Sequence, residues 1–405
     1  MINSHLICLG LVFIVIVIIV WLRKPLFVAM IAGILASILL FRIPALTALK
    51  LLAKQSASWD TIEVVLSFYL IMFIQLMMED RGQLAKANKA FNVLIRNRRM
   101  NAMIPPAIMG LLPSAAVMTI CADMVNKTIG DSMDNKSKTF VACYYRHIPE
   151  MFLPTFPAVL LALSLGHQNT GLYIVSMLPM VVLSCVIVYF TYLVKVPNDR
   201  IEVEGKIDRK GAARSLLRNL WMLIAVLVII IAANTSICVA APIVIVAGII
   251  AEHFKPKEVK SLAIRSIEPV MLGNMYLIML FKGILAHTGV MTELPVFFSG
   301  LPIPLSLAFA LLFFIGTVIS GSQAMIALCM PMAVLAFPDH FLPMFVILMS
   351  LAWAAMQISP THVCSFVAAK YYKTTLMDIV VKALPSILLF SLLAYGYGML
   401  LSCFF

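Results

Sequence analysis

Residues 102–125, AMIPPAIMGLLPSAAVMTICADMV, form an apolar stretch that is long enough to cross a bilayer but is interrupted by Pro105, Gly110 and Pro113. Proline lacks a backbone donor and glycine permits a sharp turn, so this pattern predicts two short helices joined by a tip rather than one continuous helix. We interpret the stretch as a re-entrant hairpin, which returns to the side of the membrane from which it entered.

A second interrupted stretch, 302–337, has the same character, with Gly316, Gly321 and Pro331 inside an apolar run. Backbone groups at membrane depth must find hydrogen-bond partners. A re-entrant loop is therefore tolerated only where protein covers it or where it lines a water-filled cavity. Two such hairpins in one chain predict a cavity between them.

The composition places these hairpins in an integral membrane protein. The chain has 405 residues, of which 62% are hydrophobic and 12% are charged, against about 25% charged in a typical soluble domain. This excludes a soluble enzyme, a disordered chain and a disulfide-rich secreted module. Further apolar spans are expected at about 5–22, 25–41, 61–78, 139–166, 171–194, 220–233, 238–251, 267–286, 341–369 and 379–403.

The two halves of the sequence repeat each other. We predict a first transmembrane repeat at 1–194, a cytoplasmic linker at 195–218 and a second transmembrane repeat at 219–405. At a constant offset, helix breakers align with breakers and polar residues with polar residues: Gly110 with Gly316, Ser114 with Ser320, Pro154-Thr155 with Pro360-Thr361, and Leu178-Pro179 with Leu384-Pro385.

The expected fold is an all-α polytopic membrane protein. It would be an inverted repeat of five transmembrane helices plus one re-entrant hairpin per half, with broken helices at the midplane. With the N-terminus outside, nearly all loop Lys and Arg residues fall on the cytoplasmic side, and only Arg42, Lys50 and Lys54 fall outside. If the hairpins were full spans, the basic segments 195–218 and 252–265 would face outward. The net charge of +12 therefore reflects membrane orientation and not a nucleic-acid partner.

Small polar side chains at the hairpin tips are the first candidates for substrate binding. Helix ends at such turns present unpaired N–H groups with a positive dipole, which suits an anion such as a carboxylate. Close packing of small residues between helices is the alternative explanation. The candidates are Ser114 and Thr119 in the first hairpin, and Ser320, Ser322 and Gln323 in the second.

Polar residues around two broken spans are the second set of candidates. Charge at membrane depth is costly, so such residues normally pair with one another or face a cavity. The planar guanidinium of an arginine would suit a carboxylate. Simple proline kinks and structurally hydrogen-bonded histidines are the alternatives. The candidates are Arg146, His147 and Thr155 at the first break, and Ser359, Thr361 and His362 at the second.

Two carboxylates, Asp123 and Glu150, are the candidates for ion coupling, with Na⁺ or H⁺ as the coupling ion. Glu150 lies four residues after Arg146, so an internal ion pair is an alternative for both, and Asp123 could instead cap a helix. No other cofactor is expected, and no metal site, because none of the eight cysteines forms a CxxC pair. Since GxxxxGK[ST] and HExxH motifs are absent, we do not expect an enzyme.

Two motifs carry a resemblance to known transporters. Ser359-Pro360-Thr361-His362, followed by Lys370-Tyr371-Tyr372-Lys373, resembles the C-terminal stretch of gluconate-type permeases. Gly110-Leu-Leu-Pro113, followed by Tyr145-Arg146-His147-Ile148-Pro149-Glu150, resembles an uncharacterised prokaryotic family of about ten predicted spans. That family belongs to the ion transporter superfamily, together with gluconate, citrate and dicarboxylate permeases. The resemblance implies a secondary carrier with two hairpins and two broken helices around a midplane site.

These observations favour an ion-coupled permease, or symporter, for a small organic anion such as a carboxylate, working by alternating access in the cell inner (plasma) membrane. One alternative is a cation/proton antiporter on the same scaffold, which would need a titrating carboxylate. Another is a non-transporting membrane scaffold or receptor. The expected partners are the organic anion and the lipid bilayer, and a homodimer is left open.

The predicted orientation can be tested with cysteines introduced into a chain whose native cysteines are replaced by serine. A membrane-impermeant thiol reagent should label Lys50→Cys in intact cells, because this residue is expected outside. It should label Lys210→Cys only after permeabilisation. Labelling of Lys210→Cys in intact cells would contradict the inverted arrangement.

Overall fold

The computed structural model describes residues 4–22, 24–111, 116–199, 208–339, 341–360 and 362–404. The described residues are largely α-helical and contain no strand, so the predicted all-α class is confirmed. Six helices in these ranges are long and apolar enough to cross a membrane, as expected of a membrane protein. They are α1 (Ser4–Trp21), α4 (Trp59–Asp80), α10 (Thr170–Thr191), α11 (Arg209–Ala233), α14 (Pro269–Thr288) and α20 (Leu376–Leu401).

Shorter helices lie between the long ones. In the first half they are α2 (Leu26–Leu40), α3 (Ala45–Ser56), α5 (Gln83–Leu94), α6 (Arg98–Met109), α7 (Ala116–Ile129), η1 (Gly130–Ser132), α8 (Asn135–Arg146), η2 (Ile148–Met151), α9 (Pro157–Gly166) and η3 (Leu193–Lys195). In the second half they are α12 (Ile237–Ala251), α13 (Pro256–Arg265), α15 (Val290–Ser299), α16 (Leu305–Ser320), α17 (Ser322–Ala336), α18 (Phe341–Gln357) and α19 (Val363–Tyr372).

The long helices occupy matching places in the two halves. In each half the first, fourth and last α-helices are the long apolar ones: α1, α4 and α10, then α11, α14 and α20. A short charged helix (α3 or α13) precedes the second long helix of each half. The paired short helices α6–α7 and α16–α17 follow it, and each member of a pair packs against the other. Both interrupted stretches are thus two-helix hairpins, as the prolines and glycines predict.

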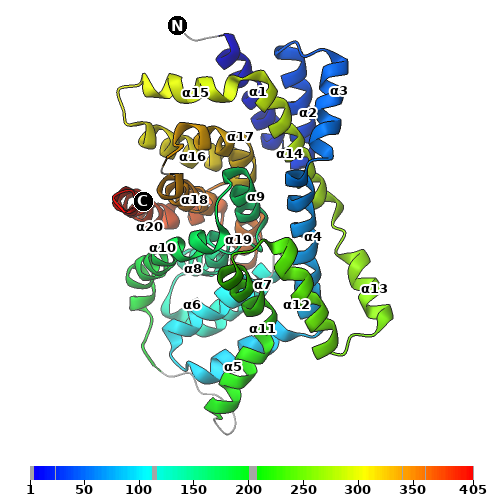
Figure 1. Ribbon diagram of the computed structural model, residues 1–405. Coiled ribbons are helices and arrows are strands. Elements are labelled where there is room, and N and C mark those ends of the chain that lie inside the picture. The colour runs from blue at the N-terminus through cyan, green and yellow to red at the C-terminus, as the bar shows by residue number, and fades with distance from the viewer. Residues whose placement is uncertain are drawn as a thin grey trace.

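The helices form two groups that draw on both halves (Figure 1). A four-helix group consists of α2, α4, α12 and α14, in which α2 packs against α14 and α4 against α12. A hairpin group consists of α6–α9 and α16–α19, in which α9 packs against α17 and α7 against α19. Because each half supplies members of both groups, neither group could form from one half alone.

Burial separates helices that face the surroundings from helices inside the protein. Helix α1 buries only Leu9, Val12 and Ile16, while apolar residues such as Ile14 and Ile18 on its other faces are exposed. Helix α18 is buried along nearly its whole length. Exposed apolar surface on this scale is unfavourable in water and suits contact with lipid.

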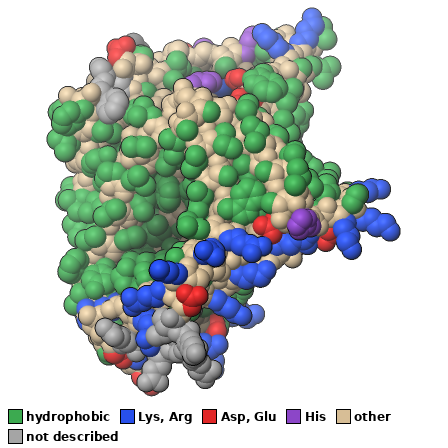
Figure 2. Space-filling model, turned by 60° about the horizontal axis from the view of Figure 1, so that its bottom comes forward, with side chains coloured by type: hydrophobic (Ala, Val, Ile, Leu, Met, Phe, Trp, Pro, Cys, Tyr) green, Lys and Arg blue, Asp and Glu red, His purple; other side chains and the backbone are tan. Residues whose placement is uncertain are grey.

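Basic residues gather at one end of the molecule, next to a broad hydrophobic surface (Figure 2). There Arg81, at the end of α4, lies 3.2 Å from Glu258 of α13, and the hydrogen bond from Arg81 holds the pKa of the Glu258 carboxyl below its usual value. Arg265 pairs with Asp80 at 2.9 Å in the same region. Both pairs are at least partly exposed, so they fix the position of α13 more than they stabilise the fold.

The predicted linker at 195–218 overlaps the start of a long helix. Helix α11 begins at Arg209, within that segment. The Asp208 side chain accepts a hydrogen bond from the Gly211 backbone N–H at 2.9 Å, which caps the helix. Residues 200–207 lie outside the described ranges. The basic residues of this segment therefore sit largely on the first turns of a membrane-length helix.

Gly110 allows the first hairpin to approach the break that follows α8. A Cβ atom at this position would lie 1.9 Å from the backbone oxygen of Arg146. No side chain can rotate to relieve this contact, because the obstructing atom belongs to the backbone. The glycine is therefore required for packing and not for an unusual backbone angle.

Gly110→Ala should lower the thermal stability of the detergent-solubilised protein by an amount corresponding to about 1–3 kcal/mol or more, as overpacking does. Gly396→Ala is the matched control, since nothing lies within 4 Å of a Cβ built there. Unfolding midpoints measured by intrinsic fluorescence would check this. Equal midpoints for the two variants would contradict the tight contact.

Candidate functional site

A cavity of about 870 Å³, the central cavity, lies where the four-helix group meets the hairpin group. The four-helix group contributes Phe68 and Met72 from α4 and Met271 from α14. The hairpin group contributes most of the polar lining. Six predicted site residues come together here: Arg146, Glu150, Ser320, Ser322, Gln323 and His362.

The first break positions two of these residues. Helix α8 ends at Arg146, and the chain continues through η2 to the start of α9 at Pro157. The carbonyls released by the break are not left without partners. The backbone oxygen of His147 accepts a hydrogen bond from Trp353 Nε1 at 2.8 Å, and that of Met151 accepts one from the Tyr173 hydroxyl at 2.7 Å. Side chains of other helices thus stabilise the non-helical backbone at this break.

The second break is tied to the second hairpin. Helix α18 ends at Gln357 and α19 begins at Val363. The Ser359 hydroxyl donates to the backbone oxygen of Val318, near the end of α16, at 2.8 Å. Ser359 was predicted to bind substrate, and in the structure this contact fixes the hairpin against the break.

Arg146 and Glu150 form an ion pair at the wall of the central cavity. Arg146 Nη1 lies 2.7 Å from Glu150 Oε1, and the side chains are 2% and 18% exposed. The internal pair that the four-residue spacing suggested is therefore present, and both residues also line the cavity. Removing one member of such a buried pair leaves an uncompensated charge, which is strongly destabilising.

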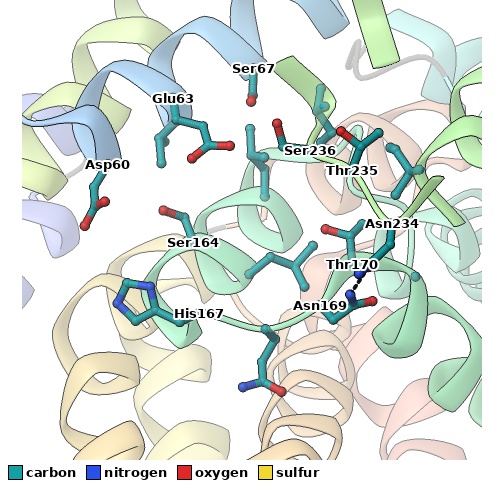
Figure 3. A pocket seen from close by; sticks show the side chains of 17 residues that line it. Asp60, Glu63, Ser67, Ser164, His167, Asn169, Thr170, Asn234, Thr235 and Ser236 are labelled. Carbon is teal, nitrogen blue, oxygen red and sulfur yellow. Dashed lines mark hydrogen bonds between the residues drawn. The ribbon is translucent and has the colours of Figure 1, made fainter. Parts of the chain in front are cut away.

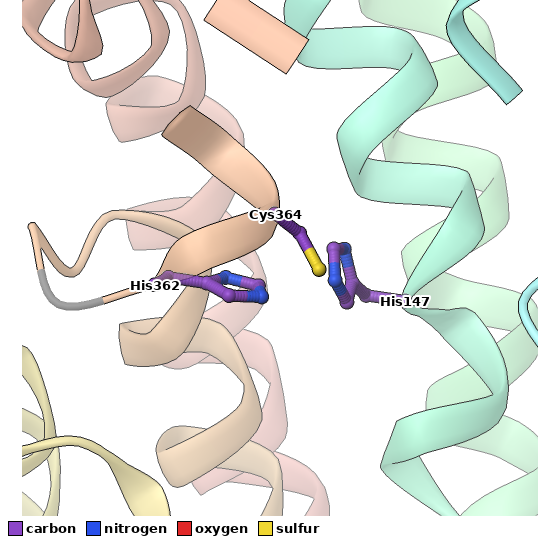
Figure 4. A group of neighbouring side chains, drawn as sticks. All are labelled: His147, His362 and Cys364. Carbon is purple, nitrogen blue, oxygen red and sulfur yellow. The ribbon is translucent and has the colours of Figure 1, made fainter. Parts of the chain in front are cut away.

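Three side chains meet between the two breaks (Figure 4). These are His147 from the first break, and His362 and Cys364 from the second. One ligand atom of each lies within 4.8 Å of the others, and the two imidazole ring centroids are 4.3 Å apart. Nitrogen and sulfur groups in this arrangement could hold a metal ion. Sequence spacing did not connect His147 with His362 and Cys364, because His147 lies in the first half of the chain and the other two lie in the second.

Several predicted site residues are placed elsewhere. Thr119 is exposed on α7 and Thr155 is buried, and neither is among the residues lining the central cavity. Asp123 is 43% exposed and pairs with Lys127 at 2.7 Å, so the structure gives it a surface ion pair. Ser114 and Thr361 lie outside the described residues.

Some cavity residues were not predicted as site residues. Trp353 lines the central cavity from α18, and Cys364 does so from the first turn of α19. Lys24 and Glu268 also line it. Trp353 lies in an apolar run without any motif. Its role in stabilising the first break is visible only from its hydrogen bond to the His147 carbonyl. Cys364 follows His362 by two residues, which was the one available signal.

A smaller cavity of about 280 Å³ lies between α4, α9 and the loop joining α11 to α12 (Figure 3). Asp60, Glu63 and His167 contribute to it, and Asn169 and Asn234 are hydrogen-bonded to each other beside it. Its described lining includes no Lys or Arg, in contrast to the central cavity. The central cavity has Lys24 and Arg146 in its lining, together with Glu150 and Glu268.

The described fold and site thus define an all-α membrane protein with a central cavity between two helix groups, largely apolar but with charged and polar side chains in its wall. Residues 5–400 match the family model described as Protein of unknown function (DUF401), and the chain belongs to this family. A search of curated proteins finds no match. Membership of a family without an assigned function is confirmed, while the relation to gluconate and citrate permeases stays a prediction.

Trp353→Phe should destabilise the protein, because it removes the donor to the His147 carbonyl at the first break. The carbonyl keeps its hydrogen bond from the Glu150 backbone N–H, so the loss of one hydrogen bond should cost about 0.5–1.5 kcal/mol. Trp21→Phe is the matched control, since Trp21 is 70% exposed. Thermal unfolding in detergent would measure both variants, and an unchanged midpoint for Trp353→Phe would contradict the assigned role.

Proposed function

We propose that this protein is an ion-coupled secondary transporter for a small organic anion, most simply a carboxylate, working by alternating access. The observation that carries the proposal is the placement of Arg146, a buried arginine, in the wall of a cavity that also receives the hydroxyls of Ser320 and Ser322 and the amide of Gln323. A guanidinium presents a planar fork of donors that matches a carboxylate. A purely structural ion pair would have no need of a cavity of this size.

The backbone around the central cavity also favours an anion. Helices α9, α17 and α19 begin at Pro157, Ser322 and Val363, and all three residues line the cavity. Helix N-termini present unpaired N–H groups and a positive partial charge. The breaks and the second hairpin thus direct three positive helix ends toward one space. Ser320, Ser322 and Gln323 add hydrogen-bonding side chains beside them.

We further propose that the two halves are inverted repeats, each with five crossings and one re-entrant hairpin. The matching order of long and short helices in the two halves supports this. The gathering of basic residues at one end supports an orientation with that end in the cytoplasm. The central cavity lies between the four-helix group and the hairpin group, so movement of one group against the other would change its access.

Glu150 would couple an ion to substrate binding. In the structure the Glu150 carboxylate accepts a hydrogen bond from the Arg146 guanidinium. A substrate carboxylate must compete with it, and a displaced Glu150 then requires a cation to balance its charge. Na⁺ or H⁺ would fill this need, so that anion and cation bind together. Asp123 is the weaker candidate, since its carboxylate is engaged by Lys127 and accepts a hydrogen bond from Tyr371.

Uptake into proteoliposomes tests the proposal. Radiolabelled mono-, di- and tricarboxylates should be accumulated under a Na⁺ or H⁺ gradient by the wild-type protein. Arg146→Gln should weaken the apparent affinity roughly 10- to 100-fold, as expected for loss of a charge-assisted contact. Arg265→Gln is the matched control, because Arg265 pairs with Asp80 outside the central cavity.

The double variant Arg146→Gln/Glu150→Gln separates loss of binding from loss of folding. It removes both charges of the pair together, so no unpaired charge is left buried. It should be folded and inactive. Absence of uptake across the whole panel, in correctly folded wild-type protein, would contradict the proposal. Cation flux without any organic substrate would instead indicate an antiporter.

A further inference from the structure

The cluster of His147, His362 and Cys364 has features that a carboxylate site does not require. One ligand atom of each residue lies within 4.8 Å of the others (Figure 4). His147 is fully buried, while His362 and Cys364 line the central cavity. The cluster joins the first break to the second, at the point where the two halves of the chain meet.

Both histidines use Nδ1 toward a backbone carbonyl. Nδ1 of His147 lies 2.5 Å from the Cys143 oxygen, and Nδ1 of His362 lies 3.3 Å from the Met356 oxygen. Each contact requires a proton on Nδ1, which leaves the lone pair of Nε2 available. Metal-binding histidines are typically oriented in this way, with the second ring nitrogen donating to a carbonyl.

The Nε2 atom of His147 makes no hydrogen bond with any described residue, although it is buried. Glu150 Oε1 lies 3.8 Å from it. A buried polar atom without a partner is rare in folded proteins and requires an explanation. An ion accepting the Nε2 lone pair would provide one.

We propose that Nε2 of His147, Nε2 of His362 and Sγ of Cys364 form a site for a borderline transition-metal ion of the Zn²⁺ class. Imidazole nitrogen and thiolate sulfur select such ions over Na⁺, Mg²⁺ and Ca²⁺, which prefer oxygen ligands. Three protein ligands leave a fourth tetrahedral position, and the central cavity lies beside it. Cys364 would release its thiol proton to water when the sulfur binds.

The local charges permit a divalent cation. The guanidinium of Arg146 would repel an ion, but Glu150 compensates it at 2.7 Å. The thiolate of Cys364 then supplies the negative charge of the site. Zinc-to-ligand distances of about 2.0–2.3 Å require ligand atoms closer together than 4.8 Å, so the two breaks would draw together by roughly 1 Å. A bound ion would link the first break to the second.

This site does not rest on the proposed transport function, and its test needs no substrate. The full-length protein, purified in detergent without an affinity tag, would be titrated with Co²⁺ alone and with Zn²⁺ alone. Co²⁺ should produce a saturable cobalt–thiolate absorption band with one ion per chain, and Zn²⁺ should displace it. Zn²⁺ should also raise the thermal unfolding midpoint.

Cys364→Ser and His362→Ala should each weaken binding by at least about 100-fold, and Cys364→Ser should abolish the thiolate band. Cys143→Ser is the near control, because Cys143 Sγ lies 3.7 Å from His147 Nδ1 but outside the proposed ligand set. Cys329→Ser is the distant control, since Cys329 is buried in α17. Both controls should bind like the wild type.

Unfolding midpoints measured without metal would establish that each variant is folded. A folded wild-type protein that binds no Co²⁺ or Zn²⁺ saturably would overturn the site. A thiolate band that persists in Cys364→Ser and disappears in Cys143→Ser would overturn the ligand assignment.

Discussion

The site depends on one constraint: backbone groups released at a helix break inside an apolar environment must find other partners. Trp353 and Tyr173 supply them at the first break, through hydrogen bonds to the carbonyls of His147 and Met151. Ser359 makes the corresponding contact between the second break and the second hairpin. Because Trp353 belongs to the second half and the carbonyl of His147 to the first, the breaks also hold the halves together.

The electrostatics of the central cavity follow from those breaks. Each break ends one helix and starts another, so the cavity receives helix N-termini together with Arg146 and Glu150. The pair is neutral in the described state, and three helix ends supply the remaining positive field. Under the proposed function, a substrate carboxylate would therefore compete with Glu150 rather than fill an open positive site. Such competition is a physical means of making anion binding depend on a cation.

Much of the fold could be predicted from local sequence, and the site in part. Gly110, Gly316 and Gly321 mark both hairpins because glycine and proline act on their own neighbours in the chain. Thr119 and Asp123 were predicted from the same hairpin pattern but lie outside the described lining of the central cavity. Their direction depends on how α7 turns about its axis when it packs, which the hairpin pattern does not reveal.

The sequence by itself determined the all-α membrane class, the two hairpins, the two breaks and the basic end, because hydropathy, helix breakers and charge act over short segments. Only the tertiary structure decided which side chains share one space. Arg146 and Glu150 meet Ser320 and His362 across the two halves of the chain, and Cys364 joins His147 there. Contacts between such distant segments arise from helix packing, and no spacing along the chain specifies them.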